Sequence, residues 1–160
     1  MTITYDIAKQ YFQYKDGNLY WKLSNSRRAP IGAKAGSMTN GYLTIRFNKT
    51  LIKNHRIVFL LHHGYMPDHI DHINGCATDN RIENLRECTQ SQNNINIRRP
   101  RHNRSGYKNV CWAKSMNKWQ VKLRVNGKTK SIGHYKDLEL ADLVATMARE
   151  KFHGEFARHD

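Results

Sequence analysis

The sequence predicts an α+β protein built from short antiparallel strands and a few helices. Two dipeptides, Asp16-Gly17 and Asn126-Gly127, each separate segments that alternate apolar and polar residues, a pattern typical of β-hairpins. A third observation is a segment of helical periodicity, Leu138–His153, which carries several alanines on one face. These features predict small antiparallel strands in the N-terminal part and a C-terminal three-stranded antiparallel sheet packed on one helix.

The N-terminal part is expected to begin with short strands. Asp16-Gly17 is a strong hairpin signal, because both central residues of such a two-residue turn need φ > 0. A second turn is expected near Asn48. The expected strands are residues 11–14, 18–23, 42–47 and 51–53.

Two helices are predicted to follow these strands. Asn54 is expected to cap the first helix, His55–His63, and the glycine after it to end that helix. After a polar stretch, the second helix is expected to begin at Glu83 or Thr89 and to continue through Ile97.

The C-terminal part is predicted to begin after a basic linker, residues 98–104, whose one apolar residue is a proline. Asp137 is the expected N-cap of the helix Leu138–His153, and Gly154 is its expected stop. The alanines of this helix let it lie close to a sheet. The three expected strands are residues 108–113, 118–125 and 128–135.

The chain is strongly basic, and its charge is unevenly distributed. It has 27 Lys plus Arg and 13 Asp plus Glu, a formal net charge of +14. Twelve of the cations and none of the acids lie between Cys88 and Lys136. Charge alone fits a solvated tail equally well, but Trp119–Val125 alternates basic and apolar residues as a half-buried strand does. We therefore expect a folded basic surface suited to nucleic acid.

Composition also argues against several classes of protein. No apolar run approaches the roughly 20 residues of a membrane-spanning helix, so no membrane partner is expected. The N-terminus lacks a signal-peptide pattern, which predicts a cytoplasmic protein that is not secreted. The three cysteines, Cys76, Cys88 and Cys111, form no C-x-x-C pair, so neither a disulfide framework nor structural zinc is expected.

The segment richest in chemically functional residues begins with Asp71-His72-Ile73-Asn74-Gly75. An Asp-His pair alone is weak evidence, because such pairs are common on protein surfaces. Here His55-Arg56 precedes it, and Asn80, Asn84-Leu85-Arg86 and Gln92-Asn93 follow. The combination resembles the HNH endonucleases with the ββα-metal motif, in particular the homing-type proteins of phage genomes. The resemblance covers roughly residues 10–97.

The resemblance implies a role for each matching residue. Asp71 matches the first metal ligand, His72 the general base, and Asn84 the asparagine that orients the histidine. Asn93 matches the second metal ligand, with Asn94 as the alternative. The expected cofactor is a divalent metal, Mg²⁺ or else Mn²⁺, because a sparse oxygen-only site suits a hard cation that keeps several waters. A histidine with a pKa near 6.5 can take a proton from water at neutral pH.

His55 and Arg56 recur in the same resemblance. For His55 a packing role and a functional role both stay open, and Arg56 is a candidate phosphate contact.

The C-terminal part resembles the AP2 DNA-binding domain over about residues 104–158. The matching motifs are Ser105-Gly106-Tyr107-Lys108-Asn109-Val110, Ile132-Gly133-His134-Tyr135 and Phe152–Ala157. In that family the exposed sheet face enters the DNA major groove. Cys111 and Ser131 depart from the family pattern, in which these positions are often Arg or Trp, so base specificity is expected to differ. The candidate DNA contacts, linker included, are Arg56, Arg98, Arg99, Arg101, Arg104, Lys108, Trp112, Lys114, Lys122, Arg124 and Lys130.

Together these features predict a DNA endonuclease that prefers certain sites. Residues 1–97 would form the HNH nuclease domain, 98–104 a basic linker, and 105–160 an AP2-like domain that binds double-stranded DNA. The expected location is the host cytoplasm if the protein is phage-encoded, and both a monomer and a homodimer are compatible with the sequence. The alternatives are a non-catalytic DNA-binding regulator and an RNA-directed binder or nuclease.

Overall fold

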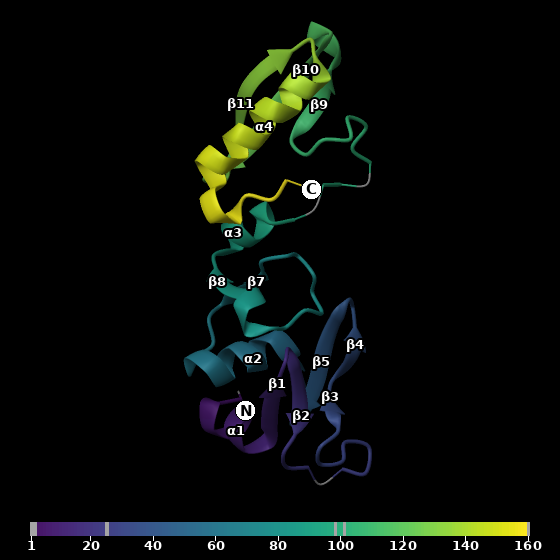
Figure 1. The fold of residues 1–160 in the computed structure, drawn as a ribbon, viewed down its shortest axis with the longest axis vertical. Helices are drawn as coiled ribbons and strands as arrows, with labels where there is room; N and C mark the ends of the chain where they lie inside the picture. The colour runs from purple at the N-terminus through teal and green to yellow at the C-terminus, as the bar shows by residue number, and fades with distance from the viewer. Residues whose placement is uncertain (1–2, 25, 98, 101, 160) are drawn as a thin grey trace. The chain divides into compact units, whose positions relative to one another are not determined.

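The computed structural model describes residues 3–24, 26–97, 99–100 and 102–159 (Figure 1). The chain divides into two compact units, Met1–Glu87 and Cys88–Asp160. Each unit combines helices with small antiparallel sheets, which confirms the predicted α+β class. No helix within the described ranges is long and apolar enough to cross a bilayer.

The first unit contains two three-stranded sheets, with strand orders β1-β2-β3 and β4-β5-β6. In the turn between β1 and β2, Asp16 and Gly17 have φ of 45° and 77°, as the hairpin prediction requires. Helix α2 packs against α1 and against β5 and β6. The elements are α1 (Tyr5–Tyr11), β1 (Phe12–Lys15), β2 (Asn18–Trp21), β3 (Lys34–Ala35), β4 (Ser37–Thr39), β5 (Tyr42–Phe47), β6 (Thr50–Lys53) and α2 (Asn54–His63).

Three of these elements lie outside the sequence predictions. Helix α1 has only 7 residues, and its N-cap is Thr4, whose Oγ1 accepts a hydrogen bond from the backbone N of Ile7 at 3.4 Å. Strands β3 and β4 have two and three residues. Such short segments carry almost no periodic signal, and β3 exists because it pairs with β2, Leu19 opposite Ala35.

The N-terminus of α2 also differs from the prediction. Lys53 is the N-cap residue, and its side chain makes no capping bond. Asn54 is buried inside the first turn, and its Nδ2 donates to the carbonyl oxygen of Ala35 at 2.9 Å. The predicted capping role of Asn54 is therefore wrong, because this carboxamide ties the helix to β3. Gly64 ends the helix with φ of 77°, as expected.

A ββα segment follows along the chain. Thr89 begins its helix with a capping box, in which its Oγ1 accepts from the backbone N of Gln92 at 3.2 Å and Gln92 Oε1 accepts from the backbone N of Thr89 at 2.7 Å. The predicted start at Thr89 is confirmed and the alternative start at Glu83 is wrong. The elements are β7 (His69–His72), the 3₁₀ turn η1 (Ile82–Asn84), β8 (Leu85–Cys88), which pairs with β7, and α3 (Gln90–Ile95).

The second unit also contains a three-stranded antiparallel sheet, with strand order β11-β10-β9, packed on helix α4, as predicted. Ala141, Ala145 and Ala148 of α4 share one buried cluster with Val121 and Leu123 of the sheet, and partly buried Trp119 packs against this cluster. Small side chains on α4 allow this close approach. The elements are β9 (Val110–Ala113), η2 (Lys114–Met116), β10 (Lys118–Val125), β11 (Lys128–Tyr135), α4 (Leu138–His153) and η3 (Gly154–Phe156).

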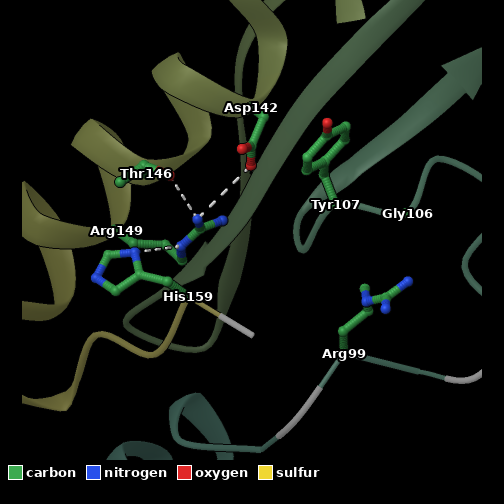
Figure 2. Close-up of a pocket in the computed structure, with 7 residues that line it drawn as sticks. All are labelled: Arg99, Gly106, Tyr107, Asp142, Thr146, Arg149 and His159. Atoms are coloured by element: carbon green, nitrogen blue, oxygen red, sulfur yellow. Dashed lines mark hydrogen bonds and ion pairs between the residues drawn. The ribbon is translucent and has the colours of Figure 1, made fainter. Parts of the chain in front are cut away.

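Arg149 of α4 is a buried cation that links three segments of this unit (Figure 2). Its Nη1 donates to the carbonyl oxygen of Lys108 at 2.7 Å and its Nη2 to Thr146 Oγ1 at 2.8 Å. Its Nε donates to His159 Nδ1 at 3.4 Å, and Asp142 Oδ1 lies 3.9 Å from Nη2. The guanidinium therefore joins α4 to the chain before β9 and to the C-terminal segment.

Candidate active site and nucleic-acid surface

The Asp71-His72 pair lies at the end of β7. Both residues are buried, with 4% and 7% of their surface exposed. Pairing of β7 with β8, and the bond from the backbone N of Ile73 to the carbonyl oxygen of Asn84 at 2.9 Å, hold the backbone here. Burial of both side chains excludes the interpretation of an ordinary surface Asp-His pair.

Asn80 holds the imidazole of His72. The Nε2 of His72 lies 3.0 Å from Asn80 Oδ1 in a buried hydrogen bond. With that oxygen as the acceptor, Nε2 carries the ring proton and Nδ1 keeps its lone pair. Asn80 is 1% exposed, and its Nδ2 has no hydrogen-bond partner in the part of the chain that the structure describes.

Asn84, the residue expected to orient His72, binds the loop after β7 instead. Its Oδ1 accepts from the backbone N of Asn74 at 3.0 Å. Its Nδ2 donates to Asn74 Oδ1 at 3.0 Å and to the carbonyl oxygen of Asp79 at 2.7 Å. The predicted contact of Asn84 with His72 is therefore wrong, because these three bonds occupy its carboxamide. Both Asn80 and Asn84 stand in the motif, and spacing alone does not show which one reaches the ring.

The same loop is held by a charged pair. Asp79 accepts hydrogen bonds from Arg81 Nε at 2.9 Å and Nη2 at 2.8 Å, and from Asn74 Nδ2 at 2.8 Å. The hydrogen bond from Arg81 lowers the pKa of Asp79 to about 2. Asp79 thus ties Asn74, before Asn80 in the chain, to Arg81, directly after it, and these contacts stabilise the loop that carries Asn80.

Two aromatic groups border His72. The ring centre of His55 lies 4.8 Å from that of His72, with the planes at 87°, and the ring centre of Tyr42 lies 6.4 Å away. Lys53 Nζ stands over the Tyr42 ring at 3.7 Å from its centre. His55 is therefore packed directly against the imidazole of His72, which supports its packing role.

Burial controls the protonation of both histidines. It lowers the pKa of His72, although the hydrogen bond with Asn80 and the charge of Asp71 act in the opposite direction. For His55, burial and the neighbouring His72 and Lys53 lower the pKa to about 3. His72 is consequently neutral at neutral pH, the form that can accept a proton.

Asp71 forms an ion pair with Arg86 of β8. The Nε and Nη2 of Arg86 donate to Asp71 Oδ2 at 3.0 Å and 2.8 Å. The two side chains are 5% and 16% exposed for Asp71 and Arg86, respectively. The pair holds the buried carboxylate in a fixed orientation. The assignment from sequence did not include Arg86, although it stands in the motif two residues after Asn84.

Helix α3 carries both candidates for the second oxygen ligand. The carboxamide of Asn93 makes no hydrogen bond to any residue that the structure describes, whereas Asn94 Oδ1 accepts from Gln90 Nε2 at 3.0 Å. Asn93 is therefore the more available oxygen donor of the two.

The chemistry of these donors limits the kind of metal that they fit. Among the described residues, no three His, Cys, Asp or Glu side chains are grouped closely enough to hold a metal ion. Each expected ligand taken by itself, the carboxylate of Asp71 and the carboxamide of Asn93, is a hard oxygen donor of the kind that Mg²⁺ prefers.

Arg56 supports the segment before β7. Its Nη1 and Nη2 donate to the carbonyl oxygens of Asp68 at 3.1 Å and Pro67 at 3.0 Å, and its Nε lies 3.3 Å from Met66 Sδ. Its guanidinium is therefore committed to the turn that leads into the Asp-His strand, and the phosphate contact of Arg56 stays a prediction.

The basic residues of the second unit occupy different environments. Arg99, Arg104 and Lys114 are exposed, whereas Lys108 is half-buried and its Nζ donates to the carbonyl oxygen of Ile95 at 3.1 Å. Two further candidates lie outside the described residues, Arg98 and Arg101.

Strand register assigns the remaining candidates to the two faces of the C-terminal sheet. Trp112 lies opposite Trp119, and Lys130 opposite Leu123, so both share the face that α4 covers. Lys130 Nζ also lies 4.5 Å from the ring centre of Phe152, on α4. Trp112 and Lys130 therefore lie on the side of the sheet that packs on α4, and their contacts with DNA stay predictions.

The outer face carries Lys122 and Arg124 of β10, both exposed. Gln120 stands beside them, and its Nε2 donates to Ser131 Oγ of β11 at 3.3 Å. The outer face therefore presents two cations, Lys122 and Arg124, beside the polar side chains of Gln120 and Ser131.

Two comparisons with known proteins match this chain. The family model described as HNH endonuclease matches residues 53–95, the range that contains α2, β7, β8 and α3. Protein 3.8 of Escherichia phage T7 is 32% identical over 92 residues, which are 56% of this chain and 74% of that protein. No solved structure matches. The matched range includes the buried Asp-His pair and the helix that follows it, and the chain accordingly belongs to the HNH endonuclease family, nucleases that hydrolyse phosphodiester bonds.

Proposed function

We propose that this chain is a metal-dependent DNA endonuclease in which His72 is the general base. The observation that carries the proposal is the buried hydrogen bond of 3.0 Å between His72 Nε2 and Asn80 Oδ1. It fixes the ring and directs the remaining lone pair to Nδ1, while burial keeps the imidazole neutral. Asn80 is then a positioning residue, and Asn84 supports it through the loop.

HNH nucleases use a divalent metal ion, and Asp71 and Asn93 would hold it here, with Mg²⁺ as the proposed ion and Mn²⁺ as an alternative. When bound, such an ion stabilises negative charge on the phosphate and on the leaving oxygen. His72 Nδ1 takes a proton from water as the water oxygen bonds to phosphorus. The bond from phosphorus to the leaving sugar oxygen breaks in the same displacement.

The C-terminal unit would serve as an AP2-like tether for double-stranded DNA. Its outer sheet face, with Lys122 and Arg124, supplies exposed cations on a rigid platform. Binding there raises the effective concentration of DNA at a catalytic site that binds metal weakly by itself. Such an arrangement suits a homing-type nuclease that prefers certain sites. One active site cuts one strand at a time, so a monomer would nick DNA.

Nicking of supercoiled plasmid in the presence of Mg²⁺ tests this proposal. The wild-type chain should nick, EDTA should abolish nicking, and His72→Ala should slow it by about 100-fold or more. His63→Ala is the matched control, because His63 is an exposed histidine of α2 and should leave the rate unchanged. Equal cleavage by wild type and His72→Ala would contradict the assignment of the base.

Two other outcomes would favour the rival functions. Tight DNA binding without cleavage by any variant would indicate a DNA-binding regulator. Faster cleavage of structured RNA than of duplex DNA would indicate an RNA-directed nuclease.

A further inference from the structure

A groove of about 700 Å³ runs beside edge strand β9 in the second unit. Its lining includes Ile97 and Pro100, which are described residues between α3 and β9, and Trp112 of β9. Ile97 is 60% exposed and Trp112 is 43% exposed. The groove is thus open to solvent and presents an unusual amount of apolar surface for so basic a unit.

The Trp112 indole packs against a second tryptophan, Trp119. Its ring centre lies 4.8 Å from that of Trp119, with the planes at 70°, an edge-to-face contact. Trp119 itself packs on the core beneath α4. A half-exposed ring that is fixed in this way is a preformed stacking platform, because little side-chain entropy is lost when a flat ligand settles on it.

Cations surround this apolar surface. Arg104, Lys114 and Lys122 line the groove, and all three are exposed. No acidic residue lies anywhere between Cys88 and Lys136 in the sequence, so nothing within that range neutralises them. The charge therefore favours an anionic occupant, and the apolar platform favours one with a flat ring.

Side-chain hydrogen bonds stabilise the segment that lies before β9 and lines the groove. Ser105 Oγ donates to the carbonyl oxygen of Val110 at 2.8 Å, and Asn103 Nδ2 donates to the carbonyl oxygen of Tyr107 at 2.7 Å. Asn109 also lines the groove, and its Oδ1 is a buried acceptor with no partner among the described residues.

We propose that this groove binds single-stranded DNA, with one unpaired base stacked on Trp112 and its phosphates on Lys114 and Lys122. The proposal rests on the proposed function only in taking DNA as the substrate. The groove shares Lys122 with the outer sheet face proposed for duplex DNA, whereas Trp112, its stacking platform, lies on the other face of the sheet. It gives the unit a means to hold a strand that is unpaired near a cut or a distorted site.

Binding of fluorescent oligothymidylate to the full chain in EDTA tests the stacking step. The comparison is an abasic oligonucleotide of equal length, which keeps the phosphates and removes the bases. We expect about tenfold weaker binding of the abasic strand, since stacking contributes about 1–3 kcal/mol per base. Equal affinity of the two strands, or tighter binding of oligouridylate RNA than of oligothymidylate, would overturn the proposal.

Substitutions of Trp112 test whether the base stacks on this residue. Trp112→Leu should lose about tenfold in affinity for oligothymidylate and nothing for the abasic strand, whereas Trp112→Phe should keep most of the affinity. Trp21→Phe, in the first unit, is the matched control. Oligothymidylate should quench tryptophan fluorescence in wild type and much less in Trp112→Phe. Unchanged quenching in Trp112→Phe would contradict the site even if the leucine variant fails to fold.

These results are independent of plasmid nicking. Loss of nicking in His72→Ala does not alter the groove, and failure of oligonucleotide binding leaves the cleavage assay unaffected.

Discussion

His72 Nε2 and Asn80 Oδ1 lie 3.0 Å apart in a buried hydrogen bond, although the two residues are eight positions apart in the chain. Asn80→Ala should therefore slow plasmid nicking by about 10- to 100-fold, because the ring loses the partner that orients it. DNA affinity should stay the same. Single-turnover nicking at saturating enzyme measures the change.

Asn80→Asp and Asn84→Ala distinguish orientation from general damage. A carboxylate at position 80 raises the pKa of His72, so the acidic limb of the rate profile should move to higher pH. Asn84→Ala should reduce unfolding stability, because the loop loses three hydrogen bonds, and should leave the pH profile in place. The same pH shift in both variants would refute the distinction.

The ion pair between Asp71 and Arg86 predicts an asymmetric response to mutation. Arg86→Ala leaves a carboxylate that is 4% exposed without its two donors from Arg86, and should cost about 3 kcal/mol in free energy of unfolding. The double variant Asp71→Asn with Arg86→Ala should recover part of that loss, since no buried charge remains. Urea unfolding of wild type, Arg86→Ala and the double variant measures the recovery. A double variant that is no more stable than Arg86→Ala would be the contrary result.

The low pKa of His55 in the native state predicts how the free energy of unfolding depends on pH. The native state keeps this pKa at about 3, whereas the unfolded chain protonates near 6.5. The unfolded state thus binds more protons below pH 6.5, and stability is lost as pH falls from 6.5 toward 3, by about 1.4 kcal/mol per pH unit at most.

His55→Gln should remove this contribution. Between pH 7 and pH 5 the wild-type chain should lose about 2 kcal/mol more than His55→Gln in urea unfolding followed by far-ultraviolet circular dichroism. Parallel stability curves for the two chains would show that His55 protonates as easily in the native state as in the unfolded chain.

The two faces of the C-terminal sheet predict different effects of removing a lysine. If six phosphates meet the basic unit, the logarithm of duplex DNA affinity should fall against the logarithm of salt concentration with a slope of about −5. Lys122→Ala should reduce this slope by about 1. Lys130→Ala should leave the slope unchanged, because its Nζ stands over Phe152 on the α4 side. Titrations at several NaCl concentrations, read by fluorescence anisotropy, compare the three chains, and equal slopes would contradict the assignment of faces.

Local signals in the sequence were enough for much of the fold. The glycine turns and the alanine face of α4 each depend on residues within a few positions of one another. For the helix α3 the sequence left two starts open, Glu83 and Thr89, and the structure decided for Thr89. Helix α1 and strands β3 and β4 could not be predicted in this way. Their few residues carry little pattern, and β3 is stabilised by pairing with β2.

By itself, the sequence determined the α+β class, the order of the C-terminal elements, the concentration of basic charge and the group of polar residues around Asp71-His72. Only the tertiary structure decided that Asn80 rather than Asn84 contacts His72, that Arg56 holds the turn before β7, and that Lys130 faces α4. The physical reason is that each of these contacts depends on the path of a loop or the register of paired strands. Both are set by packing and hydrogen bonds between residues distant in sequence, and the spacing of residues along the chain does not encode them directly.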